Sequence, residues 1–270
     1  MKDFLAKHKR IATQFFWTFA SNCYVHNFAT GFLYKGKTKF LCAPGLNCYS
    51  CPAAVFACPL GSLQSCFGDL GTLAYVAGII LAFSILLGRK ICGFFCPFGL
   101  LQDLLHKIPG KKFNNRLIPQ EASKIKYFIL AIFVVAIPAI TSLNFMTLPA
   151  FCKFICPQGI LQGAIPISAV NSQIRASLGI YFWIKICVTL TILVLSVMIL
   201  RPFCKFLCPL GAIYGLFNRF CLANVKVMEE KCTGCGACVA SCEMNCLKIN
   251  DSECIRCNKC KNACNFHAIN

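Results

Sequence analysis

The sequence predicts a mainly α-helical protein in two parts, a four-helix transmembrane domain at residues 1–221 and a small α+β domain at residues 222–270. The chain has 270 residues, of which 57% are hydrophobic and 13% charged, and its mean hydropathy is +0.66. Few soluble domains have this composition. The last forty residues differ from the rest because they are polar and dense in cysteine.

Four stretches carry few or no charges and are long enough to span a bilayer, which takes about 20 apolar residues. They lie at about residues 11–34, 70–88, 127–151 and 180–200. Pro138 and Pro149 predict a kink in the third, and Lys185 in the fourth is expected to snorkel if it lies near an interface. Core helices of a soluble protein are the alternative, but most are shorter. No small-residue cleavage site follows the first stretch, so we expect it to be retained as an anchor.

Charge predicts the orientation in the membrane. The net charge is +18, yet residues 222–270 are nearly balanced, which argues against nucleic acid as a partner. Lysine and arginine concentrate in residues 1–10 and 89–126 and are sparse in 35–69 and 149–179. The positive-inside rule then places the N-terminus and the C-terminal domain in the cytoplasm, in a multi-pass protein of the cytoplasmic membrane.

Two cysteine rows with one spacing, C-x-x-C-x-x-C-x-x-x-C, follow each other in the C-terminal domain. The first row is Cys232, Cys235, Cys238 and Cys242, and the second is Cys254, Cys257, Cys260 and Cys264. Each row supplies four thiolates, enough for one [4Fe–4S] cluster, and the fourth ligand of such rows crosses to the other cluster. We therefore assign cluster 1 to Cys232, Cys235, Cys238 and Cys264. Cluster 2 takes Cys254, Cys257, Cys260 and Cys242.

Zinc sites and disulfides are the alternatives for these rows. Zinc sites more often show two C-x-x-C pairs with a longer gap, and disulfides do not require one spacing twice. The block resembles bacterial two-[4Fe–4S] ferredoxins, but Glu243 and Asn265 stand where those proteins usually have proline. Cys246 is a further thiol without an expected partner.

A second repeat follows the four predicted spans. Each copy has the pattern Cys-Pro-x-Gly, beginning at Cys58, Cys96, Cys156 and Cys208, and three copies have another cysteine four residues earlier, at Cys92, Cys152 and Cys204. Proline directly after cysteine suits the first turn of a short helix. Five basic residues near the motifs are expected to be mainly interface anchors: Arg89, Lys90, Lys153, Arg201 and Lys205.

The predicted topology divides the motif cysteines into an inner set, Cys92, Cys96, Cys204 and Cys208, and an outer set, Cys51, Cys58, Cys152 and Cys156. Each set has the four thiolates that one [4Fe–4S] cluster needs. The hypothesis is that one or two further clusters lie near the two membrane faces. Otherwise the motifs are helix-breaking turns with buried thiols. Disulfides, a cluster or a metal site remain open for the loop containing Cys42, Cys48 and Cys66.

No motif for hydrolysis, nucleotide binding or covalent haem attachment occurs, and no catalytic residue is predicted. His26 is the one histidine in a predicted span. It is expected to contact a neighbouring helix, with a hydrogen bond to quinone as the alternative.

Together these features resemble the quinol dehydrogenase membrane components of the NapH type, which are related to NosR and CcoG-like proteins. The resemblance covers nearly the whole chain and rests on the basic N-terminus, the spans, the inner set and the two C-terminal rows. It implies an electron-transfer subunit that connects the quinol pool or a cytoplasmic donor with a redox partner across the membrane, such as another redox subunit or a cytochrome. The alternative is a redox sensor or a metallocentre-assembly factor of the NosR or CcoG type.

Overall fold

The computed structural model describes residues 2–113, 118–144 and 146–269, with side chains from residue 9 onward. Lys2 and Lys7, two of the four Lys/Arg in the first ten positions, and Arg116 of the basic 89–126 stretch therefore lie outside the described side chains. The helices are α1 (Lys2–Ser21), α2 (Asn27–Thr30), η1 (Lys37–Phe40), α3 (Pro59–Ser65), α4 (Leu70–Leu86), α5 (Lys90–Phe94), α6 (Pro97–Leu105), η3 (Gln120–Lys124), α7 (Ile125–Ile129), η4 (Leu130–Ala136), α8 (Ile137–Ser142), α9 (Ala150–Phe154), η5 (Gly159–Ala164), α10 (Ile165–Val170), α11 (Ser172–Ala176), α12 (Ile180–Met198), η6 (Phe203–Leu207), α13 (Pro209–Phe217), η7 (Glu229–Lys231), α14 (Ala237–Ala240) and α15 (Lys259–Asn262).

Two continuous helices are long and apolar enough to cross a membrane, Gln120–Ser142 and Ile180–Met198. The apolar helix α4 is shorter, at 17 residues. All three expose large apolar side chains, among them Phe128, Trp183 and Leu81. A helix in the core of a soluble protein would bury such residues, whereas a lipid-facing helix presents them.

The first predicted span, 11–34, is not one helix. Helix α1 begins at Lys2 and ends at Ser21, and α2 follows as a separate turn. Polar side chains explain the break, since Ser21 Oγ donates to the carbonyl of Trp17 at 2.7 Å and Asn22 Nδ2 to that of Thr18 at 2.9 Å. These bonds satisfy carbonyls that the next turn of helix would otherwise use.

Proline shapes the helix at residues 120–142. The segment η4 has π-helical hydrogen bonds and comes directly before α8, which carries Pro138 near its start. Proline cannot donate to the preceding turn and its ring crowds the carbonyl there, so a wider turn accommodates it. The same arrangement recurs at η5, which precedes Pro166 of α10.

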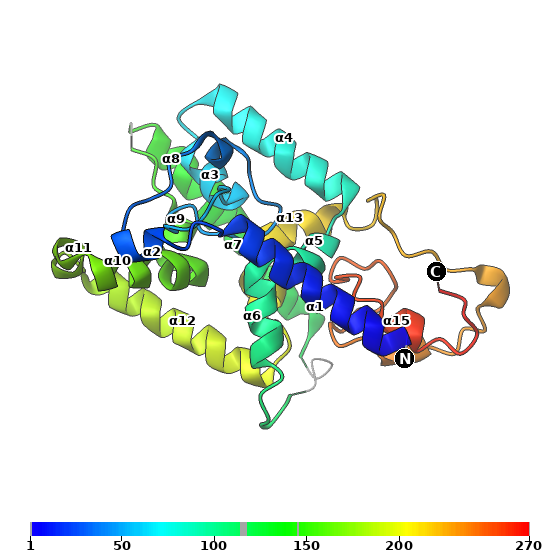
Figure 1. Cartoon of the computed structure of the whole chain (residues 1–270). Helices are drawn as coiled ribbons and strands as arrows, with labels where there is room; N and C mark the ends of the chain where they lie inside the picture. The colour runs from blue at the N-terminus through cyan, green and yellow to red at the C-terminus, as the bar shows by residue number, and fades with distance from the viewer. Residues whose placement is uncertain (1, 114–117, 145, 270) are drawn as a thin grey trace.

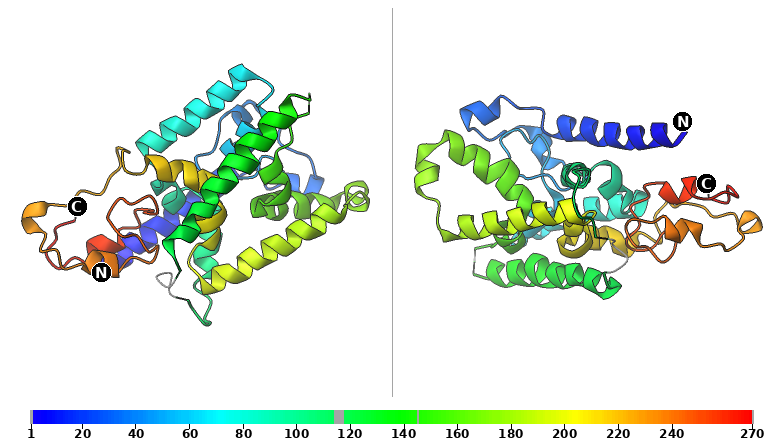
Figure 2. Two further views of the ribbon diagram at one scale, coloured as in Figure 1. Left: turned by 180° about the vertical axis from the view of Figure 1, so that it is seen from behind. Right: turned by 90° about the horizontal axis from the view of Figure 1, so that it is seen from below.

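The short motif helices lie inside the molecule and the long helices surround them (Figure 1). Helix α1 packs on α5 and α6, α12 packs on α6, and α4 packs on α3 and α13. Seen from below, α1 and the α7–α8 helix lie on opposite sides of this centre, and the C-terminal domain is at one end (Figure 2). Each of α3, α6 and α13 opens with proline, which confirms the prediction that proline after cysteine begins a helix.

The C-terminal domain has little regular structure. It contains η7, α14 and α15, and its described residues form no strand. One isolated antiparallel bridge joins Val227 to Ile269, and Met228 N donates to Ala268 O at 2.8 Å. The expected sheet of an α+β domain is therefore reduced to a single pair of residues, because backbone elsewhere forms the loops around the cysteines.

Candidate metal centres

The inner set of cysteines converges on one buried cavity. Cys92 lies in α5 and Cys204 in η6, whereas Cys96 and Cys208 cap the N-termini of α6 and α13. All four thiols line the cavity and none is more than 6% exposed. Two motifs that are more than 100 residues apart in sequence thus supply one four-thiol site.

Two fully buried arginines connect these motifs. Arg201 Nη1 donates to the carbonyl oxygen of Cys92 at 2.6 Å, and Arg89 Nη2 donates to that of Cys204 at 3.0 Å. Each arginine therefore fixes the backbone at the first cysteine of the other motif. The prediction of interface anchoring is wrong for this pair, because both guanidinium groups lie in the protein interior.

Asp103 of α6 neutralises one of these arginines. It accepts from Arg201 Nε at 2.7 Å and Nη2 at 2.5 Å, and also pairs with Arg10 of α1 at 2.5 Å. Burial favours the protonated carboxyl, but Arg201 and Arg10 outweigh it and lower the pKa of Asp103. The pair thereby joins α1 to the inner site.

A second, larger cavity of about 440 Å³ holds most of the outer set. Three of its members line this cavity: Cys58, Cys152 and Cys156. The fourth thiol there is Cys48, which the outer set does not include. Cys51 packs elsewhere, beside Ala53 and Ala54, and its sulfur lies 3.7 Å from Asn22 Oδ1. We name this space the outer cavity.

At the outer cavity, Lys185 binds the backbone of a motif cysteine, as Arg89 and Arg201 do at the inner cavity. Its Nζ donates to the carbonyl oxygen of Cys152 at 2.7 Å. A Cβ added to Gly159 would lie 2.9 Å from this Nζ, so the motif glycine makes room for the cation. Lys185 thus directs its charge to the cysteine motif.

The two cavities are neighbours. Leu46 lines both of them, and the rings of Phe151 and Phe203, each next to a motif cysteine, lie 6.5 Å apart. Tyr214 closes the inner cavity and donates to Pro44 O at 2.7 Å. The inner and outer sets therefore lie side by side in the protein, and their placement near the two membrane faces stays a prediction.

Burial favours the protonated form of several of these thiols. It raises the pKa of Cys58 and Cys204 to about 12 and that of Cys96 to about 11. The N-termini of the motif helices lower the pKa of the cysteines beside them. For example, Gly211 N donates to Cys208 Sγ at 3.4 Å. A metal centre that binds here must therefore displace protons from the thiols.

The four cysteines assigned to cluster 2 share one cavity in the C-terminal domain. These ligands are Cys242, Cys254, Cys257 and Cys260, and Cys238 and Cys246 also line the space. Hydrogen bonds from Cys246 lower the pKa of Cys242 and Cys254 to about 6, so Cys246 has partners that its sequence position did not indicate. Of the cysteines assigned to cluster 1, Cys232 and Cys235 are exposed, and the other two are half-buried.

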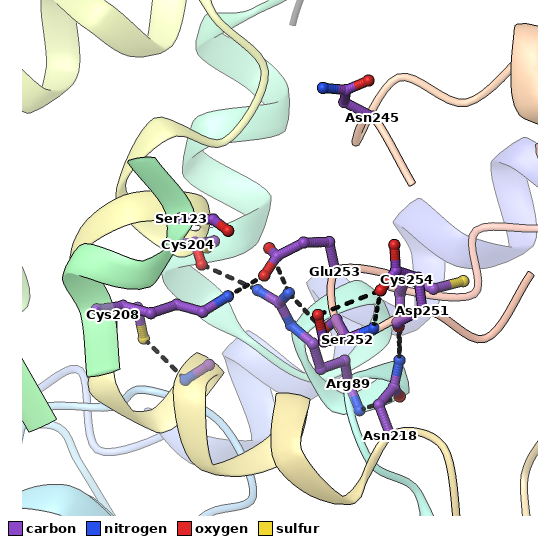
Figure 3. A network of polar contacts seen from close by, with 12 residues as sticks. Arg89, Ser123, Cys204, Cys208, Asn218, Asn245, Asp251, Ser252, Glu253 and Cys254 are labelled. Carbon is purple, nitrogen blue, oxygen red and sulfur yellow. Dashed lines mark hydrogen bonds and ion pairs between the residues drawn. The ribbon is translucent and has the colours of Figure 1, made fainter. Parts of the chain in front are cut away.

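The loop of the second row is fastened to the inner site. Glu253, directly before Cys254, pairs with Arg89 at 2.6 Å (Figure 3). It also pairs with Lys126. Arg256, two residues further on, donates to Leu87 O at 2.9 Å and Asn218 O at 2.7 Å. Arg89 consequently contacts both the inner site and the residue beside a cluster 2 ligand.

The donor sets fit [4Fe–4S] clusters better than single metal ions. In the described residues, no group of three or more His, Cys, Asp or Glu side chains is close enough to hold one ion. A cubane is wider than an ion, and its four thiolates stand correspondingly farther apart. Three cavities are each lined by at least four cysteines, and soft thiolates are the ligands that iron–sulfur clusters take.

The loop cysteines do not form disulfides. All 23 cysteines of the chain are free thiols. Cys42 is buried, Cys66 is partly buried, and neither lines the outer cavity. Of the cysteines that the sequence left open in this loop, only Cys48 joins a site.

Sequence reasoning missed the polar residues that hold these sites together. Gln64 and Gln102 both occur six residues after a motif cysteine, and both contact the partner motif. Gln162, at the same position of the third motif, accepts a hydrogen bond from Cys48 N at 3.0 Å. The recurrence of glutamine at one position was a readable signal. No feature of the sequence indicated the role of Glu253.

Comparisons with known proteins agree with this chemistry. Two family models, each described as a 4Fe-4S binding domain, match the chain, one at residues 71–116, 127–166 and 180–227 and the other at 225–248. Every segment of the first match pairs an apolar helix with a Cys-Pro motif. No solved structure matches the chain.

Several characterised and uncharacterised proteins are similar in sequence. An uncharacterized protein of Methanocaldococcus jannaschii, MJ0750, is 27% identical over 75% of this chain and 79% of its own length. The methylamine utilization ferredoxin-type protein MauN of Paracoccus denitrificans is 27% identical over 67% of this chain, and the ferredoxin-type protein NapH of Haemophilus influenzae is 24% identical over 64%. The alignments cover only 58% and 54% of those two proteins.

The cysteine sites and the matched families define an iron–sulfur electron-transfer protein of the ferredoxin type. More narrowly, the chain is similar to the NapH-type membrane ferredoxins and to the regulatory protein NosR.

Proposed function

We propose that this protein carries electrons through a row of [4Fe–4S] clusters, from its C-terminal domain through the inner site to the outer cavity. The observation that carries the proposal is the succession of cavities. The loop of cluster 2 contacts the inner site through Arg89, and Leu46 separates the inner cavity from the outer one. Electron tunnelling falls steeply with distance, so adjacent sites favour transfer between them.

Four clusters are proposed. Cluster 1 binds Cys232, Cys235, Cys238 and Cys264, and cluster 2 binds the four cysteines assigned above. The inner set binds a third. In the outer cavity Cys48 replaces Cys51 as the fourth ligand, because Cys48 lines the cavity and Cys51 does not. When bound, each cluster accepts and releases one electron at a time.

The chain's own residues prepare these sites. The cysteine thiols lose their protons on cluster binding, while Arg89, Arg201 and Lys185 hold the backbone of the ligating residues in place. Phe98 and Phe203 line the inner cavity, and Phe151 packs against Phe203; these apolar rings exclude water from the inner site. Positive charge near a reduced cluster stabilises its added negative charge, which raises its reduction potential.

A multi-pass arrangement in the membrane accords with the course of the long helices. Helix α4 starts after the first motif and ends at Leu86, close to Arg89 of the inner site, and α12 runs from the neighbourhood of Lys185 to that of Arg201. Both therefore pass from the outer to the inner end. With basic residues at the inner end, the N-terminus and the C-terminal domain lie in the cytoplasm. Reporter fusions at both termini test this orientation.

The proposed role is that of an electron-transfer subunit of a quinol dehydrogenase type complex. Quinol releases two electrons together and a cluster accepts one, so a row of clusters can divide the pair. Partners would be quinol or a cytoplasmic donor on one side, and another redox subunit or a cytochrome on the other. Two relatives are named as ferredoxin-type proteins, which supports this class.

The iron content of the anaerobically purified protein tests the proposal. Four clusters give about 16 iron atoms per chain, whereas two ferredoxin clusters alone give about 8. The double variant Cys96→Ser with Cys208→Ser should lose about four iron atoms, and so should Cys58→Ser with Cys156→Ser. A wild-type content of about 8, unchanged in both variants, would refute the cluster row.

A regulatory or assembly role of the NosR or CcoG type is the second candidate. It is favoured by similarity to the regulatory protein NosR of Stutzerimonas stutzeri, although the alignment covers only 22% of that protein. Reduction of the outer cluster by a donor that reaches only the C-terminal domain supports electron transfer. A cluster that stays oxidised under that donor supports sensing or assembly.

A further inference from the structure

Two glutamines occupy equivalent positions at the two membrane-domain sites. Gln64 lies six residues after Cys58, Gln102 lies six residues after Cys96, and both side chains are fully buried. Gln102 Oε1 accepts from Phe203 N at 3.2 Å, and Gln64 Oε1 accepts from Phe151 N at 3.0 Å. Each amide thus binds the residue that precedes the first cysteine of the partner motif.

The other end of each amide reaches a cysteine sulfur. Gln102 Nε2 lies 3.1 Å from Cys204 Sγ, and Gln64 Nε2 lies 3.3 Å from Cys152 Sγ. The backbone N–H at each site can only donate, so the amide oxygen must face it. The NH₂ end consequently faces the sulfur, and this orientation is fixed independently at both sites.

Resting on the four-cluster function proposed above, we propose that Gln64 and Gln102 set the reduction potentials of the outer and inner clusters. Each does so through an N–H···S hydrogen bond to one ligand. A reduced cluster carries one more negative charge than an oxidised cluster, and part of that charge lies on the cysteine sulfurs. A donor aimed at sulfur stabilises the reduced form more, which raises the potential. In a buried site this bond is not replaced by water.

The second hydrogen on Nε2 forms one more hydrogen bond, which fixes the orientation of the amide. It donates to the carbonyl four residues earlier, Leu60 O at 3.1 Å for Gln64 and Phe98 O at 3.4 Å for Gln102. The three bonds leave the side chain no alternative rotamer that keeps its partners. The two sites therefore share one tuning device, built on one motif position and directed across to another motif.

The test is an EPR-monitored redox titration of the full-length protein. Gln102→Leu removes the N–H···S bond at the inner site and should lower the potential of the inner cluster alone. A loss of about tenfold in the reduction equilibrium corresponds to about 59 mV for one electron. Gln64→Leu should do the same for the outer cluster, so each variant is the control of the other.

Gln162→Leu is a further control. This residue accepts from Cys48 N, and its loss removes a backbone hydrogen bond without removing a bond to sulfur. Any change in the potential of the outer cluster should therefore be much smaller than in Gln64→Leu. A shift as large as in Gln102→Leu would mean that loop packing, and not the N–H···S bond, sets the potential, and would overturn the proposal.

Gln102→Glu covers the case in which leucine prevents cluster assembly. Glutamate keeps an oxygen for Phe203 N and places a second oxygen at the sulfur. The potential of the inner cluster should therefore be lower than in Gln102→Leu. With full iron content, an unchanged potential in both variants overturns the tuning role and leaves the cluster row intact. Loss of the inner cluster in both variants makes the glutamine a structural residue, which also overturns it. A wild-type protein with about 8 iron atoms would instead refute the proposed function itself.

Discussion

Arg89 and Glu253 form a buried ion pair at 2.6 Å that joins the membrane domain to the loop of the second cysteine row. Glu253 is also bound by Lys126, and Arg89 donates to the carbonyls of Ser252 and Cys204. The pair is therefore the centre of a network that extends from a cluster 2 ligand to an inner-site cysteine (Figure 3). Its position couples the stability of the domain interface to the geometry of the proposed electron path.

Glu253→Gln should destabilise the protein strongly. It leaves Arg89 and Lys126 buried without their shared anion, and breaking a buried pair in this way costs about 3–5 kcal/mol. Thermal unfolding followed by circular dichroism in detergent measures the loss. Glu121→Gln is the matched control, since Glu121 forms an exposed pair with Lys124 three residues on and should change stability by about 0.5 kcal/mol or less. Equal effects of the two substitutions would show that the Glu253 network does not hold the interface.

The contribution of Glu253 should disappear in acid. Burial favours the protonated carboxyl, but Arg89 and Lys126 outweigh it, so the pKa of Glu253 is lower in the folded protein than its ordinary value of 4.5. A lowered folded-state pKa gives stability that is complete above 4.5 and is lost as the pH falls through the folded pKa. The difference in Tm between wild type and Glu253→Gln should therefore narrow below about pH 4.5. A constant difference down to pH 3 would contradict this.

Cys48 and Cys51 give a sharp test of the outer site. Cys48→Ser should reduce the iron content by about four atoms per chain, because one missing thiolate weakens the whole cluster. Cys51→Ser should leave it unchanged, since Cys51 faces Asn22 outside the outer cavity. The two cysteines are three residues apart in one loop, so general damage to the loop would affect both alike. Iron loss in Cys51→Ser alone would restore the sequence-based assignment.

The sequence indicated the chemistry of the sites better than their arrangement. Regular spacing revealed the two rows and the inner set, because ligation by a cubane requires closely spaced thiolates and the pattern is local. Cys51 was preferred to Cys48 because it forms a Cys-Pro pair, yet the fold turns Cys48 toward the cavity and holds its N–H with Gln162. Long-range contacts of this kind leave no trace in local spacing.

The sequence also carried no sign of the contacts that Arg89, Arg201 and Lys185 make. A basic residue at the end of an apolar stretch usually anchors at the interface, and only the fold shows that cysteine carbonyls from another motif need these donors. The first predicted span failed for a local reason, since Ser21 and Asn22 satisfy the last carbonyls of α1 and end it.

Gly93→Ala should separate cluster 2 from the inner site. A Cβ at Gly93 would lie 2.6 Å from the carbonyl oxygen of Ile255, which belongs to the backbone of the second-row loop and cannot move aside alone. The loop must shift as a unit, away from Cys92 and its neighbours. We expect a lower Tm and, in EPR spectra of the reduced protein, loss of the magnetic interaction between the inner cluster and cluster 2. Gly78→Ala is the control, because nothing lies within 4 Å of a Cβ there. In a helix interior, alanine is more stable than glycine by about 1 kcal/mol. If Gly93→Ala keeps the spectrum and the Tm of Gly78→Ala, the contact between the loop and α5 does not set the distance between the two clusters.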